Sequence, residues 1–182
     1  MDVNTRFTEW YAHARKKTGM RVTSKDQELR WLWKTVDLIL RLLTFGKQNR
    51  FYTNYTTTLF KTVYFPAGWS IDKAQLFDCI TLRHENCHIQ QNKSWGLGNV
   101  WIGTILMGFA YLFLPFPFLF AWFRYKMERE AYRISYYTAI ELKLNPNLEH
   151  YVNLLTGPEY FWTWYSKKQV RAWFRRNCRY NT

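Results

Sequence analysis

The sequence predicts an α+β fold that is mostly helical, in which a small antiparallel sheet packs on two long helices. Apolar residues recur at helical spacing over residues 71–92 and again over residues 121–144. Between residues 51 and 65 the chain is dense in aromatic and β-branched side chains, which are typical of strands. At 182 residues the chain is long enough for one domain with a sizeable core.

Within this one domain we expect three segments. They are an N-terminal helical segment (1–50), a core (51–145) and an aromatic, basic C-terminal extension (146–182). In the first segment, Phe7, Trp10 and Tyr11 indicate a short amphipathic helix, and residues 28–45 form a second helix that ends at Gly46. The second helix has a predicted apolar face made of Leu29, Leu32, Trp33, Val36, Ile39, Leu40 and Leu43.

The strand-like stretch 51–65 is predicted to form two strands joined by a turn near Thr57–Phe60. Pro66 to Trp69 then lead into the next helix, which Ser70 or Asp72 caps. A strand beside that helix offers an edge to which an extended peptide can add by main-chain pairing.

The chemistry of the chain centres on His84-Glu85-Asn86-Cys87-His88, an H-E-x-x-H motif in the helix predicted over residues 71–92. Residues four apart share one face of a helix, so His84 and His88 are able to bind the same metal ion. Glu85 is then placed to act on the water at that ion. The alternative is a pair of surface histidines.

A catalytic zinc usually has three protein ligands and an open position for water. The candidates for the third ligand are Glu128, Glu130, Glu141, Glu149 and His150. We favour Glu128 over Glu130, because the small Ala131 near Glu128 on the helix surface lets two helices approach closely enough for both to reach one ion.

The motif His84-Glu85-x-x-His88, followed by Glu128-x-Glu130-Ala131, resembles the gluzincin metallopeptidases. It looks most like their minimal, compact forms and like small H-E-x-x-H proteins of uncertain role from bacteria and bacteriophages. The resemblance covers roughly residues 50–140 and implies a minigluzincin-like zincin fold with one zinc ion. It also implies that Glu128, as the Glu of an E-x-x-A pattern, is the third ligand.

Such a site implies a zinc-dependent peptidase acting on a polypeptide or a peptide-bearing polymer, with Glu85 as the general base. Several relatives carry Asp directly after the Ala, where this chain has Tyr132. Tyr132 is a candidate catalytic residue, as a donor to the substrate oxyanion, and a packed aromatic residue is the alternative. Tyr136, His150 and Tyr160 are other candidate donors, among which the sequence does not decide.

Residues 94–123 carry no charge, which makes them a membrane-span candidate by hydropathy alone. Pro115 and Pro117 interrupt the stretch, and a full crossing would separate the two parts of the proposed metal site. We therefore expect a buried helix with a proline corner. The alternative is a shallow hairpin that makes peripheral contact with a membrane interface.

Lys and Arg outnumber Asp and Glu by 26 to 13, which favours an anionic neighbour such as a membrane, a nucleic acid or a cell-wall polymer, contacted through a basic C-terminal helix. Larger assemblies are compatible with this surface.

The polar N-terminus predicts no signal peptide, and the three cysteines predict a reducing compartment, so the expected location is cytoplasmic or virion-associated. Two other functions compete with the peptidase. One is a virion or membrane-surface structural protein with a zinc ion joining two helices, and the other is a nucleic-acid-binding module.

Overall fold

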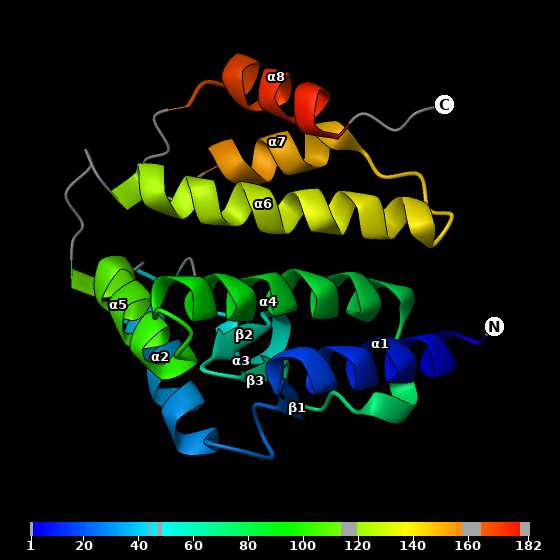
Figure 1. Cartoon of the computed structure of the whole chain (residues 1–182). Helices are drawn as coiled ribbons and strands as arrows, with labels where there is room; N and C mark the ends of the chain where they lie inside the picture. The colour runs from blue at the N-terminus through cyan, green and yellow to red at the C-terminus, as the bar shows by residue number, and fades with distance from the viewer. Residues whose placement is uncertain (1, 44, 47–48, 114–119, 158–164, 179–182) are drawn as a thin grey trace. The chain divides into compact units, whose positions relative to one another are not determined.

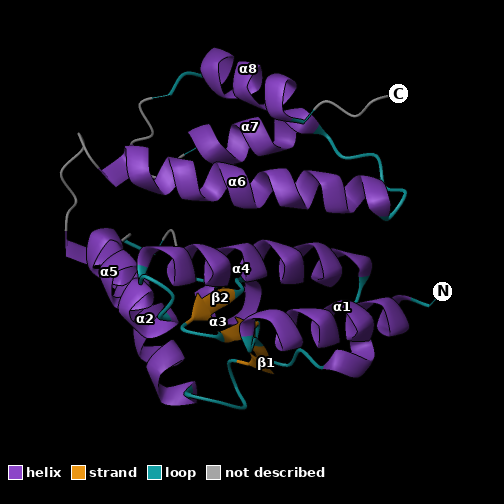
Figure 2. Cartoon of the chain, in the orientation of Figure 1, coloured by secondary structure: helices purple, strands orange, loops and turns teal. Residues whose placement is uncertain are grey.

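The computed structural model describes residues 2–43, 45–46, 49–113, 120–157 and 165–178 (Figure 1). Helices account for most of these residues, and one small sheet accounts for the strands (Figure 2). The predicted α+β class is therefore confirmed at that level. The chain divides into two compact units, Met1–Glu85 and Asn86–Thr182, and the division falls inside a single helix.

The sheet of the first unit has three strands in the order β1-β3-β2: β1 (Arg21–Ser24), β3 (Thr62–Phe65) and β2 (Thr57–Leu59). The central strand β3 is buried along its whole length. It pairs antiparallel with β2 and parallel with β1. The expectation of a purely antiparallel sheet is wrong for β1, because this strand comes from a polar stretch whose partner lies about forty residues further along the chain.

Two further local predictions concern this region. The turn between β2 and β3 falls at Phe60 and Lys61, at the end of the predicted range, because Thr57–Leu59 belong to β2; Phe60 has φ 56°. Phe51–Asn54 is a short helix, α3, and not part of a strand. The Asp37 carboxylate accepts a 2.8 Å hydrogen bond from the backbone N–H of Tyr52 in the first turn of α3, a tertiary contact that propensity does not reveal.

Two predicted N-terminal helices are present. α1 (Val3–Thr18) is capped by Asp2 and ends at Gly19, whose φ of 72° is the left-handed conformation that glycine adopts readily. Phe7 of α1 is buried against Phe65 of β3. α2 (Arg30–Leu43) buries Trp33 against Tyr64, with ring centroids 4.8 Å apart.

The remaining part of the predicted apolar face of α2 is less covered than expected. Leu29 and Ile39 are exposed, and Leu32, Val36 and Leu40 are partly buried. Three further apolar residues of this helix, Trp31, Leu38 and Leu42, are also exposed. Helical spacing therefore predicted the buried side of α2 correctly only around Trp33, where the sheet covers the helix.

The long helix α4 (Leu76–Trp95) carries the H-E-x-x-H motif. It begins later than predicted, because Ile71–Lys73 form a separate 3-10 turn, η1. Asp72 does not cap it. The N-terminal capping role falls to the Asp78 carboxylate, which accepts the backbone N–H of Gln75 at 2.8 Å.

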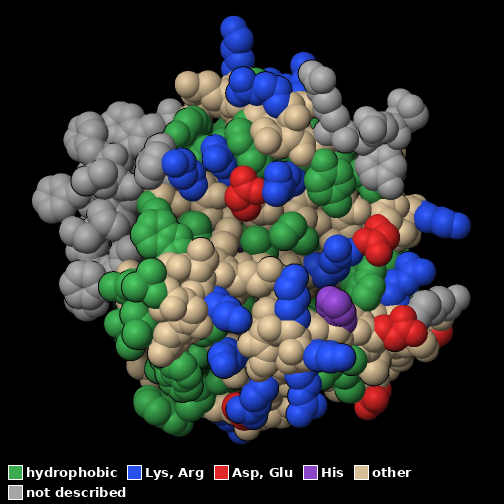
Figure 3. Space-filling model, viewed as in Figure 1, with side chains coloured by type: hydrophobic (Ala, Val, Ile, Leu, Met, Phe, Trp, Pro, Cys, Tyr) green, Lys and Arg blue, Asp and Glu red, His purple; other side chains and the backbone are tan. Residues whose placement is uncertain are grey.

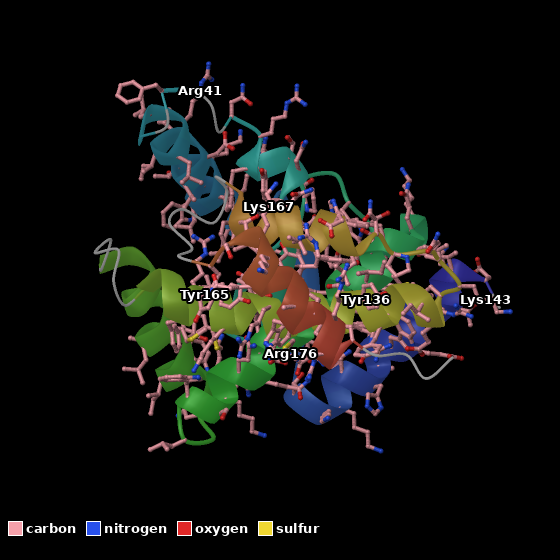
Figure 4. All side chains as sticks on the ribbon, turned by 90° about the horizontal axis from the view of Figure 1, so that it is seen from above. Arg41, Tyr136, Lys143, Tyr165, Lys167 and Arg176 are labelled. Carbon is pink, nitrogen blue, oxygen red and sulfur yellow. The ribbon has the colours of Figure 1, made fainter. Side chains whose placement is uncertain are left out.

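The second unit is helical. After the rest of α4 it contains α5 (Val100–Phe113), α6 (Phe120–Glu141), α7 (Leu148–Thr156) and α8 (Lys167–Asn177). In Figure 4, α8 lies over α6, with Lys167 at its first turn and Arg176 near its end. The core between α6, α7 and α8 is formed by Tyr125, Tyr151, Val152, Leu155, Val170, Phe174 and Cys178.

The helix α5 packs closely on the end of α4. A Cβ on Gly103 would lie 1.7 Å from the backbone oxygen of Asn92, so only glycine permits this approach. The Asn92 side chain also donates to Thr104 Oγ1 at 3.1 Å. Gly96, Gly103 and Asn92 thus fix a tight corner between the two helices.

The expectation that this uncharged region forms a buried helix is only half right. Val100 and Met107 are buried, but Trp101, Ile102, Ile105 and Leu106 are each more than half exposed. Among the described residues, no helix is both long and apolar enough to cross a membrane. The predicted proline corner at Pro115 and Pro117 lies outside the described residues, as does Tyr160.

Candidate metal centre

His84 and His88 lie one turn apart on α4, an unbroken helix from Leu76 to Trp95. The prediction that the motif is helical is therefore confirmed. Both histidines are partly buried, and residues four apart project from the same side of a helix. The helix alone thus places two imidazoles where they are able to share a ligand.

The third residue of the cluster is Glu128 of α6. It is a buried carboxylate with 8% of its surface exposed. One ligand atom from each of His84, His88 and Glu128 lies within 4.8 Å of the other two. Ala131, one turn beyond Glu128, is fully buried, in keeping with a close approach of another chain segment at this point of the helix.

The other acidic candidates have different surroundings. Glu130 forms an ion pair with Arg133 at 2.9 Å, on its own helix. Glu149 of α7 accepts two hydrogen bonds from the Arg171 guanidinium of α8, which holds the pKa of that carboxyl below its usual value. Glu141 is exposed at the end of α6. Within the described residues, Glu128 is the acid that gathers with the two histidines.

Gln91 fixes the orientation of His88. Its side-chain nitrogen donates to the backbone oxygen of Met127 at 3.0 Å, so its side-chain oxygen faces His88 Nδ1 at 2.9 Å. That oxygen accepts only if Nδ1 carries the proton, which leaves the Nε2 lone pair available. His88 Nε2 lies 3.6 Å from the Glu128 carboxylate. This is the arrangement in which an imidazole bound to metal is held by its other nitrogen.

These residues are close enough to hold a metal ion. Two imidazoles and one carboxylate form a known catalytic zinc ligand set, with bonds of about 2.0–2.2 Å. Ligand atoms around such a tetrahedral ion lie about 3.4 Å apart by the same geometry. The 3.6 Å between His88 Nε2 and Glu128 is close to that value.

Glu85, between the two histidines, is held from the sheet. The Thr58 hydroxyl of β2 donates a 2.7 Å hydrogen bond to Glu85 Oε2. The bond fixes one carboxylate oxygen and leaves the other with its lone pairs. Sequence reasoning missed Thr58, because its contact with Glu85 is a tertiary one between β2 and α4.

Lys25 is a second residue near this acid that the sequence did not indicate. Its side chain is fully buried directly after β1, and its Nζ donates to the backbone oxygens of Phe51 and Tyr55, both at 2.8 Å. Nζ also lies 3.7 Å from the centre of the Phe51 ring. Burial lowers the pKa of Lys25 to about 7, although the nearby carboxylates of Asp37 and Glu85 favour its charged form.

The candidate oxyanion donors lie against an aromatic core or at the surface. Tyr132 packs on Tyr151 at the edge of the aromatic core of the second unit, with ring centroids 5.7 Å apart. Tyr136 packs on the same ring at 6.0 Å. His150 is exposed on α7. The packed-aromatic interpretation of Tyr132 therefore has a direct structural basis, and its role as a donor stays a prediction.

In comparisons with known proteins, the chain matches no family model, no curated protein and no solved structure. Its function has to be argued from the residues of this site.

Proposed function

We propose that the protein is a zinc-dependent, metallopeptidase-like hydrolase with Glu85 as its general base. The observation that carries this proposal is the gathering of His84, His88 and Glu128 to within 4.8 Å, with an acid directly after the first histidine. A site that only binds metal has no need of that acid. The resemblance of the motif to the gluzincins supports the same function.

Bound zinc would polarise a carbonyl group and lower the pKa of a water molecule toward about 7. Glu85 would be the residue that accepts a proton from the attacking water and returns it to the leaving amine. Thr58 holds one oxygen of Glu85, so that the carboxylate does not have to be ordered during the reaction. Gln91 holds the His88 imidazole in the tautomer that ligation requires.

The proposed substrate is an extended polypeptide. β2 is one of the two outer strands of the sheet and pairs only with β3 among the described residues. A peptide added along its other edge would lie beside Glu85, because Thr58 of the same strand contacts that acid.

The alternative is a structural zinc site that joins α4 to α6. One observation favours it: Tyr132, where several relatives of the motif carry an acid, packs on an aromatic core instead. Activity of the Glu85 variant separates the two functions, as described in the Discussion.

The zinc content of the purified chain tests the ligand set. We expect one zinc per chain for the wild type, measured by elemental analysis after purification without chelator. Glu128→Ala removes a ligand and should weaken zinc binding by more than the roughly 10–100-fold that loss of an outer-shell partner costs. Glu130→Ala is the matched control, because that acid pairs with Arg133. A wild type that neither carries nor takes up zinc would refute the proposal.

A second variant tests the hydrogen bond behind the metal. Gln91→Leu removes the acceptor of His88 Nδ1–H, so we expect zinc affinity to fall about 10–100-fold, measured by competition with a chromogenic chelator. Gln90→Leu changes an exposed neighbour and should leave the affinity unchanged. Equal affinities for the two variants would show that Gln91 has no part in holding the ligand.

A further inference from the structure

The loop and helix after α4 expose a set of large apolar side chains. We call this set the α5 face, and it consists of Leu97, Trp101, Ile102, Ile105 and Leu106. Leu97 is 98% exposed and Ile105 is 63% exposed. Figure 3 shows hydrophobic side chains gathered over α5. A helix on the surface of a globular protein normally turns polar residues outward, so an exposed apolar face is a candidate docking surface.

The backbone conformation of Leu97 is a second unusual feature of this loop. Leu97 stands at φ 52°, between Gly96 and Gly98. That left-handed conformation is strained for an ordinary residue, and glycine or asparagine would occupy it at less cost. A leucine held there with its side chain in solvent gains nothing from the fold that the structure shows.

The distribution of charge indicates which kind of partner fits. Residues 94–123 carry no charged side chain, and the cations Lys93, Arg124 and Lys126 stand directly before and after them. The whole chain has a formal charge of +13. An uncharged apolar face on a chain with this positive charge, with the exposed Lys93 shortly before it, complements an anionic lipid surface, in which the headgroups meet the cations and the acyl region meets the apolar side chains. A second copy of this chain would bring the same net positive charge, which disfavours its approach.

Length and residue type agree with a shallow mode of contact. α5 has 14 residues, about 21 Å of helix, whereas the hydrocarbon core of a bilayer is about 30 Å thick. Trp101 belongs to the exposed set, and Trp95, which is also exposed, precedes it at the end of α4. Tryptophan is enriched at the headgroup level of membranes.

We propose that the α5 face docks the protein on the interface of an anionic lipid bilayer, with Leu97 and the exposed side of α5 inserted among the acyl chains and headgroups. The proposal is independent of the metal centre. A hydrolase and a structural zinc protein would use this surface in the same way.

Co-sedimentation of the full-length chain with vesicles tests the proposal. The vesicles are phosphatidylcholine alone and phosphatidylcholine mixed with phosphatidylglycerol. We expect binding to the anionic vesicles and at least about tenfold weaker binding for Ile105→Ser combined with Leu106→Ser, because each side chain loses its insertion. The matched control is Leu38→Ser combined with Leu42→Ser on α2. Those residues are similarly exposed, with Leu42 at 68%, and should leave binding within about twofold of wild type.

Leu97→Ser gives an independent measurement, because this exposed side chain can be replaced without opening the core. It should weaken vesicle binding while circular dichroism and the melting temperature stay unchanged. Three outcomes would overturn the proposal. The first is a wild type that does not bind anionic vesicles, and the second is a loss of binding that is equal for the α5 and α2 variants. The third is a wild type that, without vesicles, forms a dimer by light scattering, with the α5 variant monomeric.

Discussion

Glu85→Gln is expected to keep one zinc per chain and to lose about 10²–10⁴-fold in the rate of peptide hydrolysis, the range that general acid–base catalysis contributes. The amide is close in shape to the carboxylate and retains an oxygen that accepts the Thr58 hydroxyl, which bonds Glu85 at 2.7 Å. It has no basic oxygen with which to take a proton from water. Metal binding and proton transfer are thereby separated in one substitution.

The measurement is hydrolysis of an unstructured protein such as casein, followed by mass spectrometry of the products, with zinc content determined on the same samples. Glu130→Gln is the control, because this acid is paired with Arg133 and should keep full activity. Thr58→Val removes the hydrogen bond but not the base, so we expect a smaller loss than in Glu85→Gln. If wild type and Glu85→Gln cleave at the same rate, Glu85 is not the base. A zinc-loaded wild type without activity on any polypeptide would favour the structural alternative.

Lys25→Met is expected to lower the free energy of unfolding by about 2–4 kcal/mol at about pH 9.5. The backbone oxygens of Phe51 and Tyr55, whose bonds to Lys25 are partly buried, each lose a donor at 2.8 Å, and an acceptor left unsatisfied away from water costs about 1–3 kcal/mol. Methionine has a similar length and fills much of the same space, so the effect reports the hydrogen bonds more than a cavity. Urea denaturation followed by circular dichroism measures it.

The same pair of proteins should differ in the pH dependence of stability. The pKa of Lys25 is about 7 in the folded chain, below the 10.5 of an unburied lysine. Between these values the unfolded chain binds the proton and the folded chain does not, so the contribution of Lys25 to stability rises with pH, by at most about 1.4 kcal/mol per pH unit. Below about pH 7, Lys25 is charged in the folded chain as well, and the stability of the wild type carries the full free-energy cost of burying that charge.

We therefore expect the stability difference between wild type and Lys25→Met to widen from about pH 7 to about pH 9.5. Other groups titrate in both proteins, so their contributions to the free energy of unfolding cancel in the difference between wild type and variant. Lys61→Met, which replaces a lysine at the β2–β3 turn that is not fully buried, controls for a general effect of removing a positive charge. A gap that is constant with pH would show that Lys25 keeps its ordinary pKa in the folded chain.

The local features of the metal centre were readable from the sequence. The spacing of His84 and His88 follows from the helical repeat, and so does their common face on α4. The preference for Glu128 over Glu130 rested on the small Ala131 nearby, and the structure brings Glu128 to the histidines while Glu130 pairs with Arg133. Periodicity also identified α2 and α6, whose bounds lie within a few residues of those expected.

Features that join distant parts of the chain were not readable. β1 looks like a polar loop until its pairing with β3 is known, and the burial of Lys25 depends on that strand and on α3. The roles of Thr58 and Gln91 come from the residues that they contact. Thr58 contacts Glu85, and Gln91 contacts His88 and Met127. Hydropathy marked residues 94–123 as apolar but did not reveal which side of α5 is covered.

The sequence by itself determined the residue types of the candidate metal cluster, the helical spacing that sets two of them together, and the uncharged stretch that cations flank in the sequence. Each of these depends on residues within one or two helical turns or on composition, which the order of residues records directly. The tertiary structure alone decided the strand order, the partners of Glu85 and His88, the burial of Lys25 and the exposed side of α5. Each of these depends on contacts between residues far apart in the chain, and such contacts are fixed by packing of the whole unit and not by any local pattern.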